Sequence, residues 1–438
     1  MPTVRIEKLV FGGQGLARVS AQKASVPDKS GQVVFVWNAL PGEEVEIEYL
    51  SNKKDYAEAV ATRVIISSPD RIQPREGHFL SSSPWQMMTW EAENSWKQKI
   101  AAETYGRQGG LILDPGEPAI EFDSAGQYGY RNKLEYSFTA LADGTISLAF
   151  FERGQKQRTP VTESLLAEPV INEVSAAILA WINRQQIPLR SLKSLIVRSN
   201  HRGQAIAALF IKDQLVFPDY PAPNEKLVGF QLYYSTHKSP ASVPTKILQS
   251  AGENHLVTEL LGTKLKFGLT SFFQVNIPVF ENALRDMAAF IGPHEPLIDY
   301  YSGVGAISLP LARNRADTKL IDNNEEAIQY AKENITLNRL PHCQARCLPA
   351  EKIPELISSD GVVVLDPPRA GLHEKIIRRL AAVRPPRLVY LSCNLSTQAR
   401  DINLLSDSYK VVHLKLYNFF PRTPHIEGLC VLDRLRSD

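Results

Sequence analysis

Four strand–loop–helix units begin at Leu297 and follow one another, and this repeat restricts the fold of the chain more than any other feature. They read LIDYYSGVGAISLPLA, KLIDNNEEAIQYAKENITLNRL, GVVVLDPPRAGLHEKIIRRLAAV and RLVYLSCNLSTQARDINLLS. Apolar strands that alternate with helices are typical of a parallel sheet with helices on both faces. The repeat therefore predicts a doubly wound, Rossmann-like α/β domain over residues 266–438. Its ligands should bind beyond the carboxyl ends of the strands.

Short strands broken by glycine turns fill residues 1–65. The runs VRIEKLVF, VVFVWNAL, EEVEIEYL and YAEAVATRVI alternate apolar and polar side chains, as strands with one buried face do. This pattern predicts an N-terminal five-stranded β-barrel. Such a barrel binds oligonucleotides in some proteins and is purely structural in others, and the pattern alone does not separate these two roles.

A central α+β domain is predicted between these two parts, over residues 70–265. Strand-like runs there are mixed with one clear helix, PVINEVSAAILAWINRQ. An earlier helical pattern, MTWEAENSWKQKIAAETYGRQ, carries Lys97, Lys99 and Arg107. Their charges fit a solvent-facing side of a helix as well as they fit contacts with phosphate groups.

The composition says more about the cellular compartment of the protein than about its binding partners. The net charge of +2, from 49 basic and 47 acidic residues, neither requires nor excludes a nucleic-acid partner. The four cysteines, Cys343, Cys347, Cys393 and Cys430, lie in the last quarter of the chain; so few and so clustered, they indicate a reducing compartment. No signal-peptide pattern or apolar run of about 18 residues is present. We therefore expect a cytoplasmic protein with no membrane contact.

The first turn of the doubly wound sheet favours one class of cofactor. Gly303 and Gly305 follow its first strand, and the third glycine of the dinucleotide fingerprint would fall on Ser308, so that fingerprint fails. Asp322 ends the second strand, where a carboxylate can accept hydrogen bonds from both ribose hydroxyls. A glycine turn followed by an acidic second strand, without a phosphate cradle, favours S-adenosyl-L-methionine over a dinucleotide.

Two further strand ends and one loop carry reactive groups. Asp366 opens the stiff Asp-Pro-Pro-Arg sequence, which could also be a simple strand-end turn. Cys393 follows a buried strand just before a helix, where the helix N-terminus favours the thiolate, although a lone cysteine is often a small apolar core residue. His425 and Glu427 lie on a proline-rich loop that is either a surface loop or the carrier of a general base.

Taken in order, these motifs resemble those of the uracil-C5 RNA methyltransferase family, which includes rRNA enzymes and the tRNA m5U54 enzyme. The matching segments are Ser271-Phe272-Phe273-Gln274-Val275-Asn276, the DYYSGVG turn, Asp366-Pro367-Pro368-Arg369-Ala370-Gly371, Ser392-Cys393-Asn394, and Pro421-x-Thr423-Pro424-His425-x-Glu427. Residues 1–65 resemble the TRAM barrel of the rRNA members, and Tyr130-Arg131-Asn132-Lys133 resembles a segment of their central domain. The resemblance covers essentially the whole chain.

The resemblance implies that this chain binds S-adenosyl-L-methionine. Gln274 and Tyr301 would contact the cofactor, and Asp322 would hold its ribose. Asp366 would lie near both the cofactor and the target base.

The resemblance also implies a covalent mechanism. Cys393 would add to C6 of uracil, which makes C5 nucleophilic, and Glu427 would then remove the C5 proton. The target uridine must be unpaired or flipped out of a helix. The barrel favours 23S rRNA over tRNA as the RNA partner, because the tRNA enzyme typically lacks it. We expect no obligate protein partner.

Other functions remain as alternatives. One alternative is cytosine-C5 methylation of RNA. Enzymes of that kind use a Pro-Cys pair, and this chain has none. A non-catalytic RNA-binding protein with this fold would need neither Cys393 nor Glu427. Many TRAM-bearing relatives carry cysteines for a [4Fe–4S] cluster, and the matched positions here are Glu76, Ser82, Trp85 and Ser164. These side chains supply no thiolate, so we expect no iron–sulfur cluster and no metal.

Overall fold

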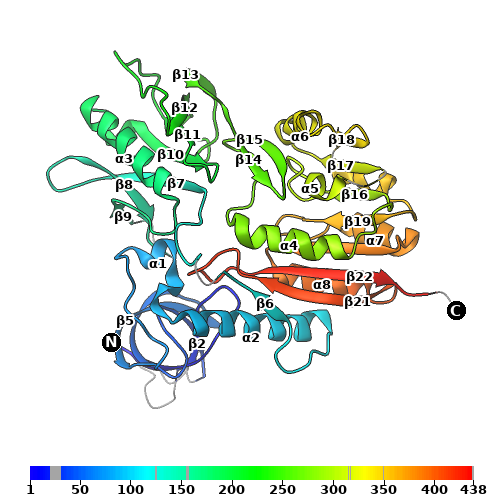
Figure 1. Ribbon diagram of the computed structural model, residues 1–438. Coiled ribbons are helices and arrows are strands. Elements are labelled where there is room, and N and C mark those ends of the chain that lie inside the picture. The colour runs from blue at the N-terminus through cyan, green and yellow to red at the C-terminus, as the bar shows by residue number, and fades with distance from the viewer. Residues whose placement is uncertain are drawn as a thin grey trace.

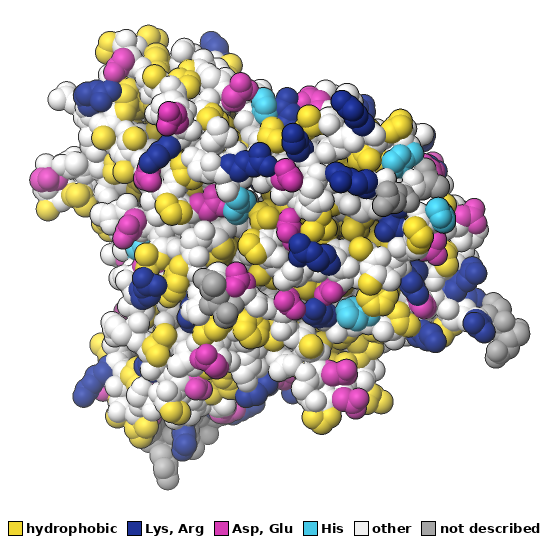
Figure 2. Space-filling view, viewed as in Figure 1, with side chains coloured by type: hydrophobic (Ala, Val, Ile, Leu, Met, Phe, Trp, Pro, Cys, Tyr) yellow, Lys and Arg dark blue, Asp and Glu magenta, His cyan; other side chains and the backbone are white. Residues whose placement is uncertain are grey.

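The computed structural model describes residues 1–19, 31–123, 126–153, 157–313, 315, 317–348 and 350–436. Figure 1 shows a barrel at the lower left, a sheet with one covering helix at the upper left, and a larger sheet between helices on the right. Among the described residues, no helix has the length and apolar character needed to cross a membrane. On the face in Figure 2, basic and acidic side chains are interspersed, in keeping with the small net charge.

The N-terminal part is a closed five-stranded barrel, as the alternating runs predict. Its strands pair in the order β1-β2-β3-β5-β4. Val45 and Ile47 point inward with no exposed surface, whereas their neighbours in the same strand are partly exposed. The barrel strands are β1 (Thr3–Leu9), β2 (Gly15–Arg18), β3 (Val33–Trp37), β4 (Glu44–Asn52) and β5 (Tyr56–Ile66).

The central part is a seven-stranded sheet covered on one face by α3 (Pro169–Arg184). The helix starts with Pro169 in its first turn, and Ile171, Val174 and Ile178 then lie buried on the side that faces the sheet. The sheet order is β13-β12-β11-β10-β7-β8-β9. These strands are β7 (Lys133–Ala140), β8 (Ile146–Phe151), β9 (Arg158–Val161), β10 (Leu192–Ser199), β11 (Ala205–Ile211), β12 (Leu227–Tyr234) and β13 (Lys246–Gly252), with the short helix η3 (Leu189–Ser191) before β10.

The C-terminal part is an eight-stranded sheet in the order β18-β17-β16-β19-β20-β22-β21-β6. The strands β18, β17, β16, β19 and β20 are parallel, and β22 runs antiparallel to β20. The strands are β6 (Ala119–Glu121), β16 (Leu297–Tyr300), β17 (Thr318–Asp322), β18 (Cys343–Cys347), β19 (Val362–Leu365), β20 (Arg387–Ser392), β21 (Tyr409–Tyr417) and β22 (Glu427–Arg434).

Helices cover both faces of this sheet, which makes it doubly wound as expected. Val362 and Val364 of β19 belong to one core and Val363 and Leu365 to the other, because neighbouring side chains of a strand point to opposite faces. One face carries α4 (Ile277–Ala289), α5 (Ser308–Ala312) and α6 (Glu325–Leu337); the other carries α2 (Trp90–Gly109), α7 (Glu374–Val383) and α8 (Leu395–Leu405). The strand order reverses between β16 and β19, and ligands bind at such reversals.

The structure departs from the expected boundary of the central domain. Helix α2 packs against α8, and β6 extends the C-terminal sheet beside β21, although residues 90–121 were assigned to the central domain by sequence. Before α2 lie α1 (Phe79–Ser82) and η2 (Pro84–Met87). The hairpin of β14 (His255–Leu260) and β15 (Thr263–Gly268) forms a separate sheet, and η4 (Ala350–Leu356) precedes β19.

Candidate active site

A cavity of about 960 Å³ lies at the carboxyl ends of the parallel strands. It is lined by the six residues to which the sequence analysis assigned a catalytic or cofactor-binding role, namely Gln274, Tyr301, Asp322, Asp366, Cys393 and Glu427. This volume is at the upper end of the roughly 300–1,000 Å³ found for small-molecule pockets. The fold therefore brings together residues that are up to 153 positions apart in the chain.

Cys393 and Glu427 are neighbours because of the antiparallel pairing of β20 with β22. In this pairing Ser392 lies opposite Gly428, so Cys393, one residue beyond β20, lies beside Glu427 at the start of β22. A Cβ at Gly428 would lie only 2.7 Å from Gln398 Oε1. The glycine thus allows β22 to approach α8 closely next to Glu427.

The Ser392-Cys393-Asn394 motif fixes the loop that carries the thiol. Asn394 caps α8, and its side-chain oxygen accepts a hydrogen bond from the backbone N–H of Ser396 at 3.1 Å. Its side-chain nitrogen donates to the carbonyl of Arg369 at 2.8 Å. One asparagine therefore ties the Cys393 loop to the Asp-Pro-Pro-Arg loop.

Burial and two neighbouring carboxyl groups act against ionisation of the thiol. Burial, and then the carboxyl groups of Glu427 and Asp366, raise the pKa of the Cys393 thiol, while Arg369 lowers it, and the resulting pKa is about 11. The predicted helix does begin just after the cysteine, at Leu395. We expected from the sequence that the helix N-terminus would favour the thiolate. This expectation is wrong, because burial and two carboxyl groups together raise the pKa of the thiol.

The two carboxyl groups are also shifted towards their protonated forms. Burial, and then the nearby Asp366, raises the pKa of Glu427 well above its ordinary value. Burial raises the pKa of Asp366 to about 7. A carboxylate with a raised pKa binds a proton tightly, and this property suits a general base.

The turn after β16 forms the other half of the cavity. Asp322 Oδ2 accepts a hydrogen bond from the backbone N–H of Gly303 at 2.9 Å, which joins the ends of β16 and β17. Gly305 has a φ of 90°, and a Cβ there would lie 2.7 Å from Leu309 Cγ. Tyr301 also has a left-handed backbone, with a φ of 65°. The turn thus presents a carboxylate, a phenol and backbone to the cavity, and this set of groups fits S-adenosyl-L-methionine.

Gln274 is held in the cavity by contacts with the central sheet. The Asn132 side-chain nitrogen donates to the Gln274 carbonyl at 2.9 Å. The fully buried guanidinium of Arg198 donates to the carbonyls of Gly268 at 3.0 Å and Leu269 at 3.2 Å, and also to that of Ser271. Sequence reasoning did not single out Arg198, because a strand residue of this kind has no motif around it.

The structure separates several alternatives that the sequence left open. Glu427 lines the cavity, and His425 is not among its lining residues. Lys97 is fully buried, so it is neither a solvent-facing nor a phosphate-binding residue. The cavity also includes side chains that the sequence analysis gave no role, among them Phe272, Arg369, His373 and Arg400.

The positions matched to cluster cysteines in relatives form a polar contact region. Glu76 is buried and accepts hydrogen bonds from the backbone N–H of Leu165 at 2.6 Å and from Ser83 Oγ at 3.4 Å, as well as from the Gln86 side chain. The part of the chain that the structure describes contains no group of three side chains able to hold a metal ion. The residues at these positions do not fit a thiolate-bound cluster.

Two sequence-family profiles match the chain. The family described as tRNA (Uracil-5-)-methyltransferase matches residues 357–435, and the TRAM domain matches residues 2–62. The first match contains Asp366, Cys393 and Glu427, and the second contains the barrel. The chain is thus similar to RNA uracil-5 methyltransferases in its C-terminal part and to TRAM domains in its N-terminal part. It is therefore an RNA methyltransferase that depends on S-adenosyl-L-methionine, as the sequence analysis expected.

Two relatives are similar over nearly the whole chain, and one solved structure shares its fold. An RNA methyltransferase of Aquifex aeolicus is 29% identical and matches over 98% of this chain and 97% of its own length. An RNA methyltransferase of Nostoc is 27% identical over 90% of both chains. The fold is similar to that of the Pyrococcus abyssi tRNA (uracil-54, C5)-methyltransferase in complex with S-adenosyl-L-homocysteine, with a TM-score of 0.77 and 22% identity, over 98% of this chain and 99% of that one.

Proposed function

We propose that the chain methylates C5 of a uridine in RNA, with Cys393 as the nucleophile and Glu427 as the base. The observation that carries this proposal is the juxtaposition of Cys393 and Glu427 at the β20–β22 pairing, inside the cavity that also contains Asp322 and Tyr301. A protein that only binds RNA needs no thiol beside a buried carboxyl group.

The proposed chemistry assigns one step to each residue. The Cys393 thiolate forms a bond to C6 of uracil, and the electron pair of the C5–C6 double bond moves to C5 and the O4 carbonyl. When bound, S-adenosyl-L-methionine supplies a methyl group whose bond to sulfur breaks as its bond to C5 forms. Glu427 then accepts the C5 proton, the C5–C6 double bond re-forms, and the thiolate leaves C6.

Arg369 and Asp366 support these steps from the adjoining loop. Arg369 favours the thiolate, because its positive charge lowers the pKa of Cys393. Asp366 raises the pKa of Glu427, and this makes the ionised Glu427 a stronger base for the C5 proton. The target base must leave its stack to reach this cavity.

Two RNAs are candidates for the target. The N-terminal barrel is the sequence feature that favours 23S rRNA over tRNA. The Pyrococcus tRNA (uracil-54, C5)-methyltransferase shares the fold over 98% of this chain, so a barrel alone does not separate rRNA from tRNA. We propose 23S rRNA as the target and tRNA as the alternative.

The test is methyl transfer to unmodified transcripts of 23S rRNA and of tRNA, followed by nucleoside mass spectrometry. We expect 5-methyluridine in one RNA, at one mapped position, and no product with the Cys393→Ala variant. Methylation of a base other than uracil, or an unchanged rate for Cys393→Ala, contradicts the proposal. Which of the two transcripts is methylated decides between 23S rRNA and tRNA as the target.

A further inference from the structure

The loop between β21 and β22, residues 418–426, ends directly at Glu427, and we call it the Glu427 loop. Connecting loops usually run over the surface, whereas Pro421, Arg422 and Thr423 are buried. Buried backbone groups must find hydrogen-bond partners within the protein. The partners of this loop come from three separate parts of the chain.

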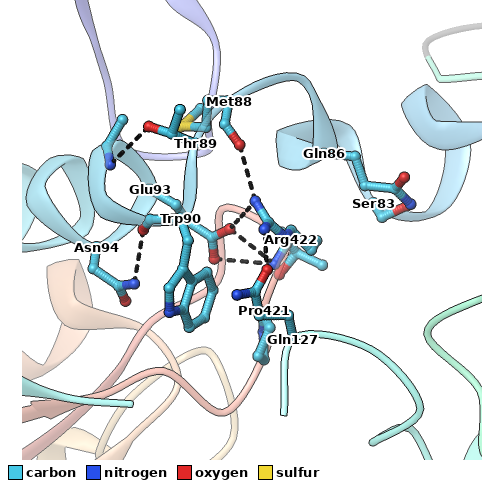
Figure 3. A network of polar contacts seen from close by, with 12 residues as sticks. Ser83, Gln86, Met88, Thr89, Trp90, Glu93, Asn94, Gln127, Pro421 and Arg422 are labelled. Carbon is cyan, nitrogen blue, oxygen red and sulfur yellow. Dashed lines mark hydrogen bonds and ion pairs between the residues drawn. The ribbon is translucent and has the colours of Figure 1, made fainter. Parts of the chain in front are cut away.

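Helix α2 supplies a buried ion pair. Lys97 and Glu93 have no exposed surface, and Lys97 Nζ lies 2.8 Å from Glu93 Oε1. The Glu93 carboxylate accepts the backbone N–H of Arg422 at 3.0 Å, as Figure 3 shows. The Lys97 ammonium donates to Asn418 Oδ1 at 2.7 Å and to the carbonyl of Phe420 at 3.1 Å. Since a buried ion pair adds little net stability, its clearest effect is to fix the course of this loop.

Arg422 holds the loop in a strained conformation. Its φ is 63°, a left-handed conformation that costs a residue other than glycine about 1–3 kcal/mol unless its surroundings enforce it. Its guanidinium lies 5.2 Å from the ring centroid of Trp90 and donates to the carbonyl of Met88 at 2.9 Å. The surroundings of Arg422 therefore determine one backbone path into Glu427.

The barrel reaches the Glu427 loop through the turn between β1 and β2. A Cβ at Gly13 would lie 2.7 Å from Pro424 Cγ and nearer still to its Cβ. Trp85 bridges the two segments, because its indole N–H donates to the Gly13 carbonyl at 3.1 Å and its backbone N–H donates to the Arg422 carbonyl at 3.1 Å. Gly12 has almost the same φ, 98° against 97°, but a Cβ there would meet no atom within 4 Å.

The segment that leads into the central sheet provides the third contact. The Tyr130 hydroxyl donates to the carbonyl of Pro421 at 2.9 Å, and both residues are buried. The guanidinium of Arg422 also donates to the side-chain oxygen of Gln127. The Glu427 loop is therefore the place where the barrel, helix α2 and the central part meet.

We propose that the barrel and the central part position Glu427 for removal of the C5 proton, with Gly13 and Tyr130 as positioning residues. This inference rests on the proposed function. It gives the barrel a second role besides any contact with RNA.

Positioning of Glu427 affects one step of the reaction more than the others. Addition and methyl transfer use Cys393, which lies on a different loop that is tied to Arg369. Proton removal alone needs Glu427 at its place beside C5. A misplacement of about 1 Å can lower a catalysed rate by about 100-fold. A displaced Glu427 loop therefore slows elimination after the methyl group has been transferred.

The experiment measures both steps in one reaction. RNA labelled with tritium at C5 of uridine is methylated in single turnovers by S-adenosyl-L-methionine with a ¹⁴C-labelled methyl group. The ¹⁴C in RNA reports methyl transfer, and tritium released to water reports proton removal. The variants are Gly13→Ala and Tyr130→Phe, and the matched control is Gly12→Ala, which imposes the same backbone strain without the contact.

For Gly13→Ala we expect tritium release to slow by about tenfold or more, with methyl transfer within about twofold of wild type. A methylated protein–RNA adduct should accumulate. Tyr130→Phe should shift the ratio in the same direction, and Gly12→Ala should behave as wild type. Equal slowing of both steps in Gly13→Ala and Tyr130→Phe, or an effect on RNA affinity alone, overturns the inference. If the wild-type protein neither transfers the ¹⁴C-labelled methyl group to RNA nor releases tritium to water, the proposed function itself is overturned.

Discussion

Replacement of Lys97 by methionine is expected to destabilise the protein strongly, although charged residues on helices are usually exposed. The change leaves the fully buried carboxylate of Glu93 without its partner at 2.8 Å. Removal of one partner of a buried pair costs about 3–5 kcal/mol. Arg422 Nη1 remains 3.7 Å from Glu93 Oε2, so we expect a loss near the lower end, about 3 kcal/mol.

The assay is urea unfolding at equilibrium, followed by tryptophan fluorescence. Lys99→Met is the matched control on the same helix, because Lys99 is exposed, and it should change stability by less than about 0.5 kcal/mol. The double variant Glu93→Gln, Lys97→Met should lose less than the sum of the single losses, since no carboxylate remains buried without a partner. A Lys97→Met loss below about 1 kcal/mol, or strict additivity, refutes the reasoning.

Three further predictions concern the site. Because the pKa of Cys393 is raised to about 11, the thiolate is the minor form at pH 7. The rate of adduct formation with 5-fluorouridine RNA should therefore increase about tenfold per pH unit from pH 7 to 9. A rate that no longer increases above pH 8 contradicts this prediction. Arg198→Met removes the hydrogen bonds that hold the segment before Gln274. The Kd for S-adenosyl-L-methionine, measured by calorimetry, should therefore rise by at least about tenfold, or about 1.4 kcal/mol. An unchanged Kd contradicts this prediction. Gly428→Ala places a Cβ 2.7 Å from Gln398 Oε1 and should slow tritium release, whereas equal slowing of methyl transfer would show a general defect.

Local patterns were sufficient to predict the three-part fold and the edge of the sheet that carries the site. Strand ends at Tyr300, Asp322, Leu365 and Ser392 follow directly from the apolar runs before them. Since the carboxyl ends of parallel strands share one edge, residues just beyond these ends meet in space. The neighbourhood of Cys393 and Glu427 needed one more fact, the antiparallel pairing of β20 with β22.

Contacts between distant segments were not predictable in this way. Lys97 looks like a solvated helix residue because its partner Asn418 is 321 positions away. The membership of α2 and β6 in the C-terminal layers likewise depends on pairing with β21 and α8. The direction of the Cys393 pKa shift depends first on burial and then on the carboxyl groups of Glu427 and Asp366, and the motifs do not show that the thiol is buried.

The central claim is that Cys393 attacks uracil and Glu427 removes the C5 proton. Fluorine at C5 cannot leave as the proton does, so 5-fluorouridine RNA should trap the enzyme after methyl transfer. The direct measurement is mass spectrometry of the wild-type protein trapped with S-adenosyl-L-methionine on 5-fluorouridine transcripts of 23S rRNA and tRNA. We predict a methylated RNA adduct on the peptide that contains Cys393. An adduct on another cysteine, or none with either RNA while S-adenosyl-L-methionine binds, contradicts the account.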